Sequence, residues 1–184
     1  MPVIAYSDGT ANALKMPRCT SISCAATTRG TIGTPISATY AHTSLSFGND
    51  GFPVIAYGDR TSNEVRVVKC GNATCSMGNV NTTVSAFSGD GDTPSITIGA
   101  DGLPFIAWHR DSSQFAKCRD VACASSFVDS VNLSTFSAGQ AVSVTTGADG
   151  MPVWAYMASA DGTSFDVRVV RCSNPFCMNN WVRR

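Results

Sequence analysis

The chain has 184 residues, enough to bury a core, and its 13 Lys plus Arg are balanced by 13 Asp plus Glu. This balance excludes a strong field of one sign, so neither nucleic acid nor an anionic membrane is expected as a partner. Only 14% of the residues are charged and Glu64 is the sole glutamate, while Ser, Thr, Gly and β-branched residues abound, a composition that favours strands and turns over helices.

One segment recurs along the chain. Residues 95–108 read S-I-T-I-G-A-D-G-L-P-F-I-A-W, and close variants occupy residues 44–57 and 143–156; the second half also opens the chain at residues 1–6. Recurrence about every fifty residues indicates a repeat architecture. Spacings from Ser to Pro and from the second Cys to the next Ser are constant, so all length variation lies between the Pro and the first Cys.

The residue pattern of each repeat predicts four short strands. Alternation over residues 95–98 indicates a first strand, and Asp101-Gly102 indicates a tight turn, because glycine accepts the positive φ that such a hairpin needs. Residues 104–108 are nearly all apolar, which predicts a second strand buried on both faces. A third strand is clearest at residues 64–70 and 166–172, and a weaker fourth strand is expected at residues 80–87 and 127–133.

These elements predict an all-β protein, a β-propeller of four-stranded antiparallel blades. Residues 1–184 are expected to form a single propeller domain or propeller fragment, with repeats at about residues 1–40, 41–91, 92–139 and 140–184. The first repeat lacks its inner strand and the last lacks most of its outer strand, so the chain looks like a window cut from a longer array. A β-sandwich or β-solenoid is the alternative.

The strand-Asp-Gly-strand unit resembles the first hairpin of propeller repeats of the NHL and sialidase-like kinds. The resemblance is architectural and covers the whole chain, but the sialidase motif S-x-D-x-G-x-x-W is not matched.

The eight cysteines form four C-x4-C pairs, one in each repeat. This pattern predicts a disulfide in each hairpin and an oxidising, extracytoplasmic compartment. Zinc binding is the alternative, although structural zinc sites usually use tighter C-x2-C pairs. The pairs are Cys19 with Cys24, Cys70 with Cys75, Cys118 with Cys123, and Cys172 with Cys177.

No apolar run approaches the length of a membrane span, and the first residues lack a basic segment followed by an apolar one. Either a signal peptide has been removed, or the chain is an excerpt of something larger.

The loops between second and third strands carry every length change, and variable loops on a fixed scaffold commonly serve recognition. Their polar residues suit hydrogen bonding to a sugar or peptide, but the same residues are ordinary in exposed hairpins. The candidate ligand-binding residues are Asp8, Asp59, Arg60, His109, Arg110, Asp111 and Asp161.

Two further positions recur once per repeat. An aromatic residue ends each second strand, where it either packs between blades or offers a stacking surface to sugars. A basic residue precedes each first Cys and forms an anion-binding ring, a solvated strand face, or a partner for the nearby Asp-Gly turn. The aromatic residues are Tyr6, Tyr57, Trp108 and Tyr156, and the basic residues are Arg18, Lys69, Lys117 and Arg171.

A catalytic set is not evident. Sialidase-like hydrolysis would need an arginine triad with a Tyr/Glu pair, and other glycosidases need two facing carboxylates. His42 and His109 are the only histidines and lack a nucleophile setting, and Asp90 with Asp92 gives an incomplete calcium ligand set. We therefore expect no enzyme activity, no metal and no cofactor.

The first interpretation is a non-enzymatic extracytoplasmic binding module for glycans or surface proteins. The alternative is a structural propeller fragment that forms a homo-oligomer through its open blade edges, which favour pairing between chains. A piece of a propeller glycosidase is the third possibility.

Overall fold

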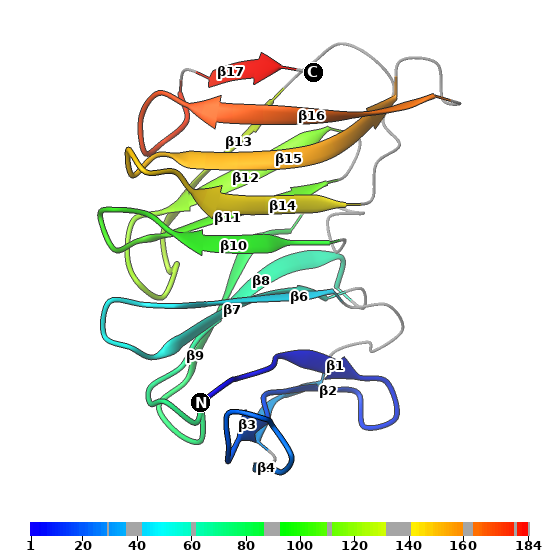
Figure 1. The fold of residues 1–184 in the computed structure, drawn as a ribbon, viewed down its shortest axis with the longest axis vertical. Helices are drawn as coiled ribbons and strands as arrows, with labels where there is room; N and C mark the ends of the chain where they lie inside the picture. Colours follow the sequence, from blue (N-terminus) through cyan, green and yellow to red (C-terminus); the bar gives the residue numbers. More distant parts are fainter. Residues whose placement is uncertain are drawn as a thin grey trace.

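The computed structural model describes residues 1–28, 30–35, 42–59, 62–86, 93–109, 112–131, 141–159, 164–178 and 180–183. These residues form antiparallel strands and contain no helix (Figure 1). None of the described segments is therefore a helix long and apolar enough to cross a membrane.

Three four-stranded sheets, here called blades II, III and IV, follow one another along the chain. Blade II contains β6 (Thr43–Phe47), β7 (Pro53–Asp59), β8 (Glu64–Lys69) and β9 (Val80–Ser85). Blade III contains β10 (Ser95–Ile98), β11 (Pro104–His109), β12 (Ser113–Cys118) and β13 (Ser126–Val131). Blade IV contains β14 (Val142–Thr146), β15 (Pro152–Ser159), β16 (Phe165–Cys172) and β17 (Asn180–Arg183).

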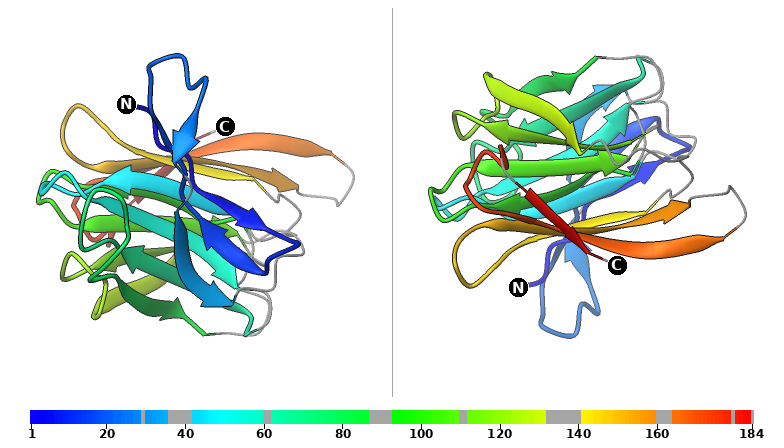
Figure 2. Two further views of the ribbon diagram at one scale, coloured as in Figure 1. Left: turned by 90° about the horizontal axis from the view of Figure 1, so that it is seen from below. Right: turned by 90° about the horizontal axis from the view of Figure 1, so that it is seen from above.

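Blade I is the incomplete first repeat. It contains β1 (Tyr6–Asp8), β2 (Ala13–Lys15) and β5 (Thr31–Pro35), and its cysteine hairpin forms a separate pair, β3 (Arg18–Cys19) with β4 (Thr27–Thr28). Seen from either end of the stack, this hairpin projects away from the other blades (Figure 2). The predicted all-β partial propeller is confirmed, including the missing first inner strand and the short last outer strand.

Hydroxyl groups link neighbouring inner strands. β10 lies between β6 and β14 (Figure 1). The Ile96 N–H donates to Ser44 Oγ across 3.1 Å, and the Val144 N–H donates to Ser95 Oγ across the same distance. The serine that opens the repeat thus satisfies a backbone donor of the next blade in blades II and III, which the sequence pattern did not indicate.

Each apolar core lies between two successive blades. We call the side of a blade that packs on the following blade its forward face, and the side that packs on the preceding blade its rear face. Side chains alternate between these faces along a strand. The forward face of blade II, for example Val65 and Val67, packs on the rear face of blade III, for example Ile106 and Trp108. The I–II and III–IV interfaces repeat this arrangement.

The burial of the second strands depends on whether a blade has a neighbour on both faces. Every residue of β7 and β11 is buried, as predicted, because each lies between two neighbouring blades. In β15 buried residues alternate with more exposed ones, because blade IV has a neighbour on its rear face and none in the described chain on its forward face. Burial on both faces is therefore a property of position in the stack.

All eight cysteines form the four predicted disulfides, each within its own hairpin, which excludes zinc binding by these thiols. The second cysteine of each pair has a positive φ, 55° at Cys24 and 52° at Cys75. Three of the bridges also lie in the cores between blades, where Cys75 Sγ is 3.5 Å from Met16 Sδ. The disulfides indicate folding in an oxidising compartment outside the cytosol.

Candidate functional site

The Asp-Gly turns of blades II to IV share one rim of the stack. In blade III the turn aspartate, Asp101, accepts the Leu103 N–H at 3.0 Å, and Gly102 has a φ of 77°. The positive φ favours glycine at this position, and a Cβ atom there would lie 2.4 Å from Asn49 Nδ2 of blade II, so the Asn49 side chain would have to move. A Cβ at Gly51 would meet no atom within 4 Å, because no described inner strand precedes blade II.

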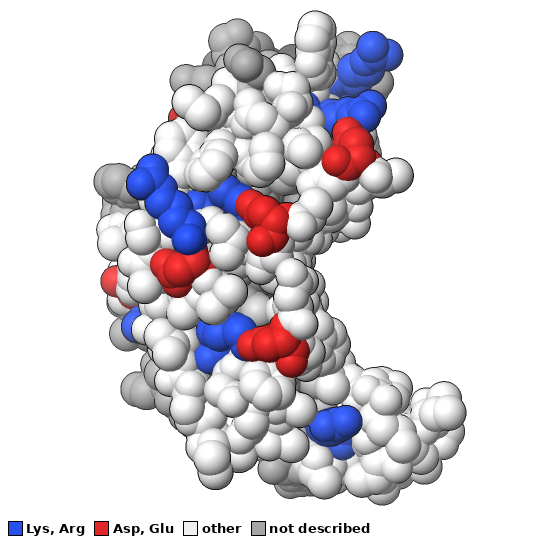
Figure 3. Space-filling view, turned by 90° about the vertical axis from the view of Figure 1, so that its left-hand side faces the viewer, with Lys and Arg blue, Asp and Glu red and all other residues white. Residues whose placement is uncertain are grey.

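Each of these aspartates forms an ion pair with the basic residue before the first cysteine. Asp50 lies 2.7 Å from Lys69 Nζ. The corresponding pairs, Asp101 with Lys117 and Asp149 with Arg171, are each separated by 2.8 Å. Figure 3 shows acidic and basic side chains in adjacent pairs on this side of a crescent-shaped molecule. Among the alternatives for the basic residues, the turn partner is thus correct in blades II to IV.

The ion pairs shift the pKa values of the aspartates. The hydrogen bond from Lys69 lowers the pKa of Asp50 below 3.8, and that from Arg171 lowers the pKa of Asp149. At Asp101 burial opposes ionisation, but the hydrogen bonds from Lys117 and the Leu103 N–H together outweigh it and lower the pKa. These three carboxylates are ionised at neutral pH and serve the turns, so they are unsuited to act as general acids.

Three of the predicted ligand-binding residues are described by the structure, and they lie on the opposite rim. Asp8 at the end of β1 is paired with Lys15, and Asp59 at the equivalent position of blade II lies 3.8 Å from Arg66 Nη1. His109 ends β11 and is 8% exposed. The structure places these residues on three different blades. Four other predicted residues lie outside the described part of the chain: Arg60, Arg110, Asp111 and Asp161.

The aromatic residues that end the second strands are mostly packing residues. Tyr57 and Trp108 are fully buried and Tyr156 is 6% exposed, each in a core between blades. Tyr6 is 40% exposed because the rear face of blade I has no described neighbour. Packing between blades is therefore correct for three of the four residues, and sugar stacking is left without support at those positions.

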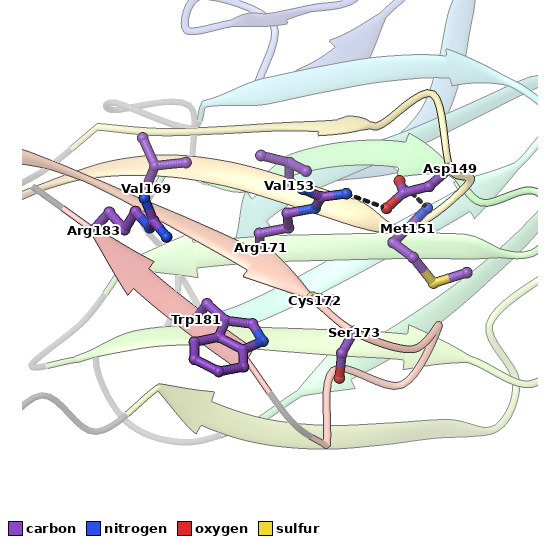
Figure 4. Close-up of a pocket in the computed structure, with 9 residues that line it drawn as sticks. All are labelled: Asp149, Met151, Val153, Val169, Arg171, Cys172, Ser173, Trp181 and Arg183. Carbon is purple, nitrogen blue, oxygen red and sulfur yellow. Dashed lines mark hydrogen bonds and ion pairs between the residues drawn. The ribbon is translucent and has the colours of Figure 1, made fainter.

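An open pocket of about 830 Å³ lies on the forward face of blade IV (Figure 4). The Asp149–Arg171 ion pair borders one side, and Trp181, Val169 and Arg183 lie across the strands β16 and β17. Sequence reasoning did not single out this pocket. A signal was available, since Trp181 pairs with Arg171 in the same register as Phe127 pairs with Lys117.

A metal centre is not found in the described ranges, where no three His, Cys, Asp or Glu side chains gather to hold an ion. The Asp90 and Asp92 pair falls outside these ranges. Within the described residues, the chemistry of both rims therefore depends on carboxylates, hydroxyls and basic side chains.

Comparisons with known proteins find similar folds among solved structures and no similar sequences. No protein-family model and no curated protein matches the chain. An α-L-arabinofuranosidase from Lactobacillus brevis superposes with a TM-score of 0.52 at 10% identity, covering 73% of this chain and 49% of that one. A glycosyl hydrolase from Bacteroides ovatus superposes with a TM-score of 0.51 at 14% identity, covering 92% and 60%. The chain thus spans less than two thirds of either structure.

These comparisons bear on two expectations from the sequence: the absence of enzyme activity and the resemblance to known propeller repeats. The expectation that the chain is not an enzyme is contradicted, because the solved structures that share its fold are propeller glycosidases. The propeller architecture of the predicted resemblance is confirmed, while NHL or sialidase identity of the repeats stays a prediction. At these identities the likeness establishes architecture, and the chain has a partial β-propeller fold shared with glycoside hydrolases.

Proposed function

We propose that the chain is part of a β-propeller glycoside hydrolase, with α-L-arabinofuranosides as the first substrate class to test. The observation that carries the proposal is the backbone likeness to the Lactobacillus brevis enzyme and the Bacteroides ovatus hydrolase. Fold alone does not define chemistry, so the proposal depends on locating carboxylates that can act on a glycosidic bond.

Glycoside hydrolysis generally uses two carboxyl groups, one as acid and one as nucleophile or base. The turn aspartates are occupied by Lys69, Lys117 and Arg171, which disfavours the rim of the Asp-Gly turns. The opposite rim is favoured because its loops vary in length and carry Asp59 and Asp111. Asp59 lies 3.8 Å from Arg66 Nη1, a longer contact than the 2.7 to 2.8 Å of the turn pairs. A second carboxylate is expected from another loop of that rim or from a segment beyond this chain.

The direct test incubates the purified chain with 4-nitrophenyl α-L-arabinofuranoside and a panel of other chromogenic glycosides. Binding to arabinan and arabinoxylan is measured in parallel by affinity electrophoresis. We expect hydrolysis or binding that is lost in Asp59→Asn or Asp111→Asn and retained in Asp50→Asn, which changes a carboxylate on the other rim. Circular dichroism of each variant confirms folding. A folded chain that neither cleaves nor binds any of these substrates would refute the proposal.

A further inference from the structure

The forward face of blade IV is apolar and uncovered. Val167 is 63% exposed, Val169 is 40% exposed and Trp181 is 70% exposed. At the position of Val169, Val67 in blade II is fully buried and Phe115 in blade III is 1% exposed, because the next blade covers them. Exposed apolar clusters of this kind commonly mark interaction surfaces.

The basic residue that pairs with the turn aspartate is also more exposed in blade IV than in blades II and III. Its side chain is 8% exposed at Lys69 and 1% exposed at Lys117, but 64% exposed at Arg171. The three residues occupy the same forward position of β8, β12 and β16. Arg171 is therefore exposed because its blade has no described neighbour in front of it, and the pocket of Figure 4 lies on the face that the next blade covers in blades II and III.

The other end of the stack has the matching half. On the rear face of blade I, Ile4 is 49% exposed and Tyr6 is 40% exposed. Their equivalents in blade II, Ile55 and Tyr57, are fully buried against blade I. Among the described residues, the stack of blades thus has an exposed rear face on blade I and an exposed forward face on blade IV.

We propose that the forward face of blade IV binds the rear face of blade I of a second copy of this chain. The argument is that forward-to-rear packing already occurs three times within the chain, and that the two uncovered faces are the two halves of that same contact. Such a contact is heterologous, so it either closes a ring or continues as an open assembly. The proposal is independent of the hydrolase activity proposed above.

The first measurement is the mass of the chain in solution, by light scattering after size exclusion over a wide concentration range. We expect at least twice the 19.3 kDa of one chain. Fluorescence gives a second readout, because Trp108 and Trp154 are already buried and Trp181 is exposed. Emission is expected to shift to shorter wavelength as the concentration rises.

Two variants separate the faces. Val169→Asp places a carboxylate on the forward face of blade IV, and Ile4→Asp places one on the rear face of blade I. Each is expected to weaken self-association by about a hundredfold or more, because burying an unpaired carboxylate is strongly unfavourable. Val121→Asp is the matched control: Val121 is 52% exposed on the cysteine turn of blade III, on neither open face, and its replacement should leave the mass unchanged.

Mixing the variants tests the head-to-tail geometry. The Val169→Asp chain keeps an intact blade I and the Ile4→Asp chain keeps an intact blade IV, so the mixture should form one-to-one pairs although each variant alone is monomeric. The proposal is overturned if the wild-type chain is monomeric at all concentrations, if Ile4→Asp alone associates like the wild type, or if the folded variants fail to pair. A monomeric wild type would instead indicate that a further blade of the same polypeptide covers this face.

Discussion

The Lys117–Asp101 pair allows the sharpest prediction about stability. Lys117 is the most buried charged side chain of the turn rim, 1% exposed, and its Nζ donates to Asp101 Oδ1 at 2.8 Å and to the Leu103 carbonyl oxygen at 3.0 Å. In Asp101→Asn the amide oxygen still accepts the Leu103 N–H, so the turn is preserved. The ammonium, however, loses its counter-ion while the Lys117 side chain itself stays buried.

Removing one partner of a fully buried ion pair costs about 3–5 kcal/mol. Here the carboxylate is 34% exposed and Lys117 keeps its bond to the Leu103 oxygen, so we expect Asp101→Asn to lower the free energy of unfolding by about 2–3 kcal/mol. For a domain of this size that corresponds to a decrease in Tm of about 4–12 °C. The equivalent change Asp149→Asn should lower the free energy of unfolding much less, since the Arg171 side chain is largely exposed and water screens the pair.

Chemical and thermal unfolding, followed by circular dichroism, measures both variants at the same dilute concentration. The double variant Asp101→Asn with Lys117→Met completes the test, because an apolar side chain removes the unpaired charge and should recover most of the loss. Equal losses in Asp101→Asn and Asp149→Asn, or no recovery in the double variant, would show that burial of Lys117 is not what makes this pair matter.

Three further predictions follow from the same contacts. The pKa values of Asp50, Asp101 and Asp149 are lowered in the folded chain, so at acidic pH the unfolded chain binds more protons than the folded chain. Tm should therefore be constant from pH 7 to about 5 and decrease below about pH 4. A variant with all three aspartates replaced by Asn should show a smaller decrease. Ser95→Ala removes the acceptor of the Val144 N–H and should lower the free energy of unfolding in urea by about 1–2 kcal/mol. Ser143→Ala, at the exposed equivalent position, should lower it by less than about 0.5 kcal/mol. Equal effects of the two changes would argue against the link between inner strands. Replacing Cys118 and Cys123 by Ala should lower the free energy of unfolding by more than the roughly 2 kcal/mol of a short-loop disulfide, because both cysteines are buried between blades. The same change at Cys19 and Cys24 should stay near that value, because Cys24 is less buried. Thermal unfolding of the two variants compares these losses.

Local patterns of residues are sufficient to predict the repeat and most of the strands of a blade. Period-two alternation and the Asp-Gly turns are local signals, so the strand at Ser95–Ile98 and the turn at Gly102 could be placed from the residues alone. The disulfides could also be predicted, because two cysteines that flank a four-residue turn can bridge within one hairpin.

Which copies of a repeated residue are buried and which are exposed depends on the packing of one blade against the next. Lys117 and Arg171 occupy the same position of the repeat, yet one is buried and the other lies in the open pocket, because exposure depends on the neighbouring blade and not on the local sequence. The links from Ser44 and Ser95 to the next inner strand likewise join residues about fifty positions apart, a distance over which local patterns carry no information. A blade cannot cover its own two faces, so the ends of the stack, and with them the surface left open for a partner, are set by how the repeats pack.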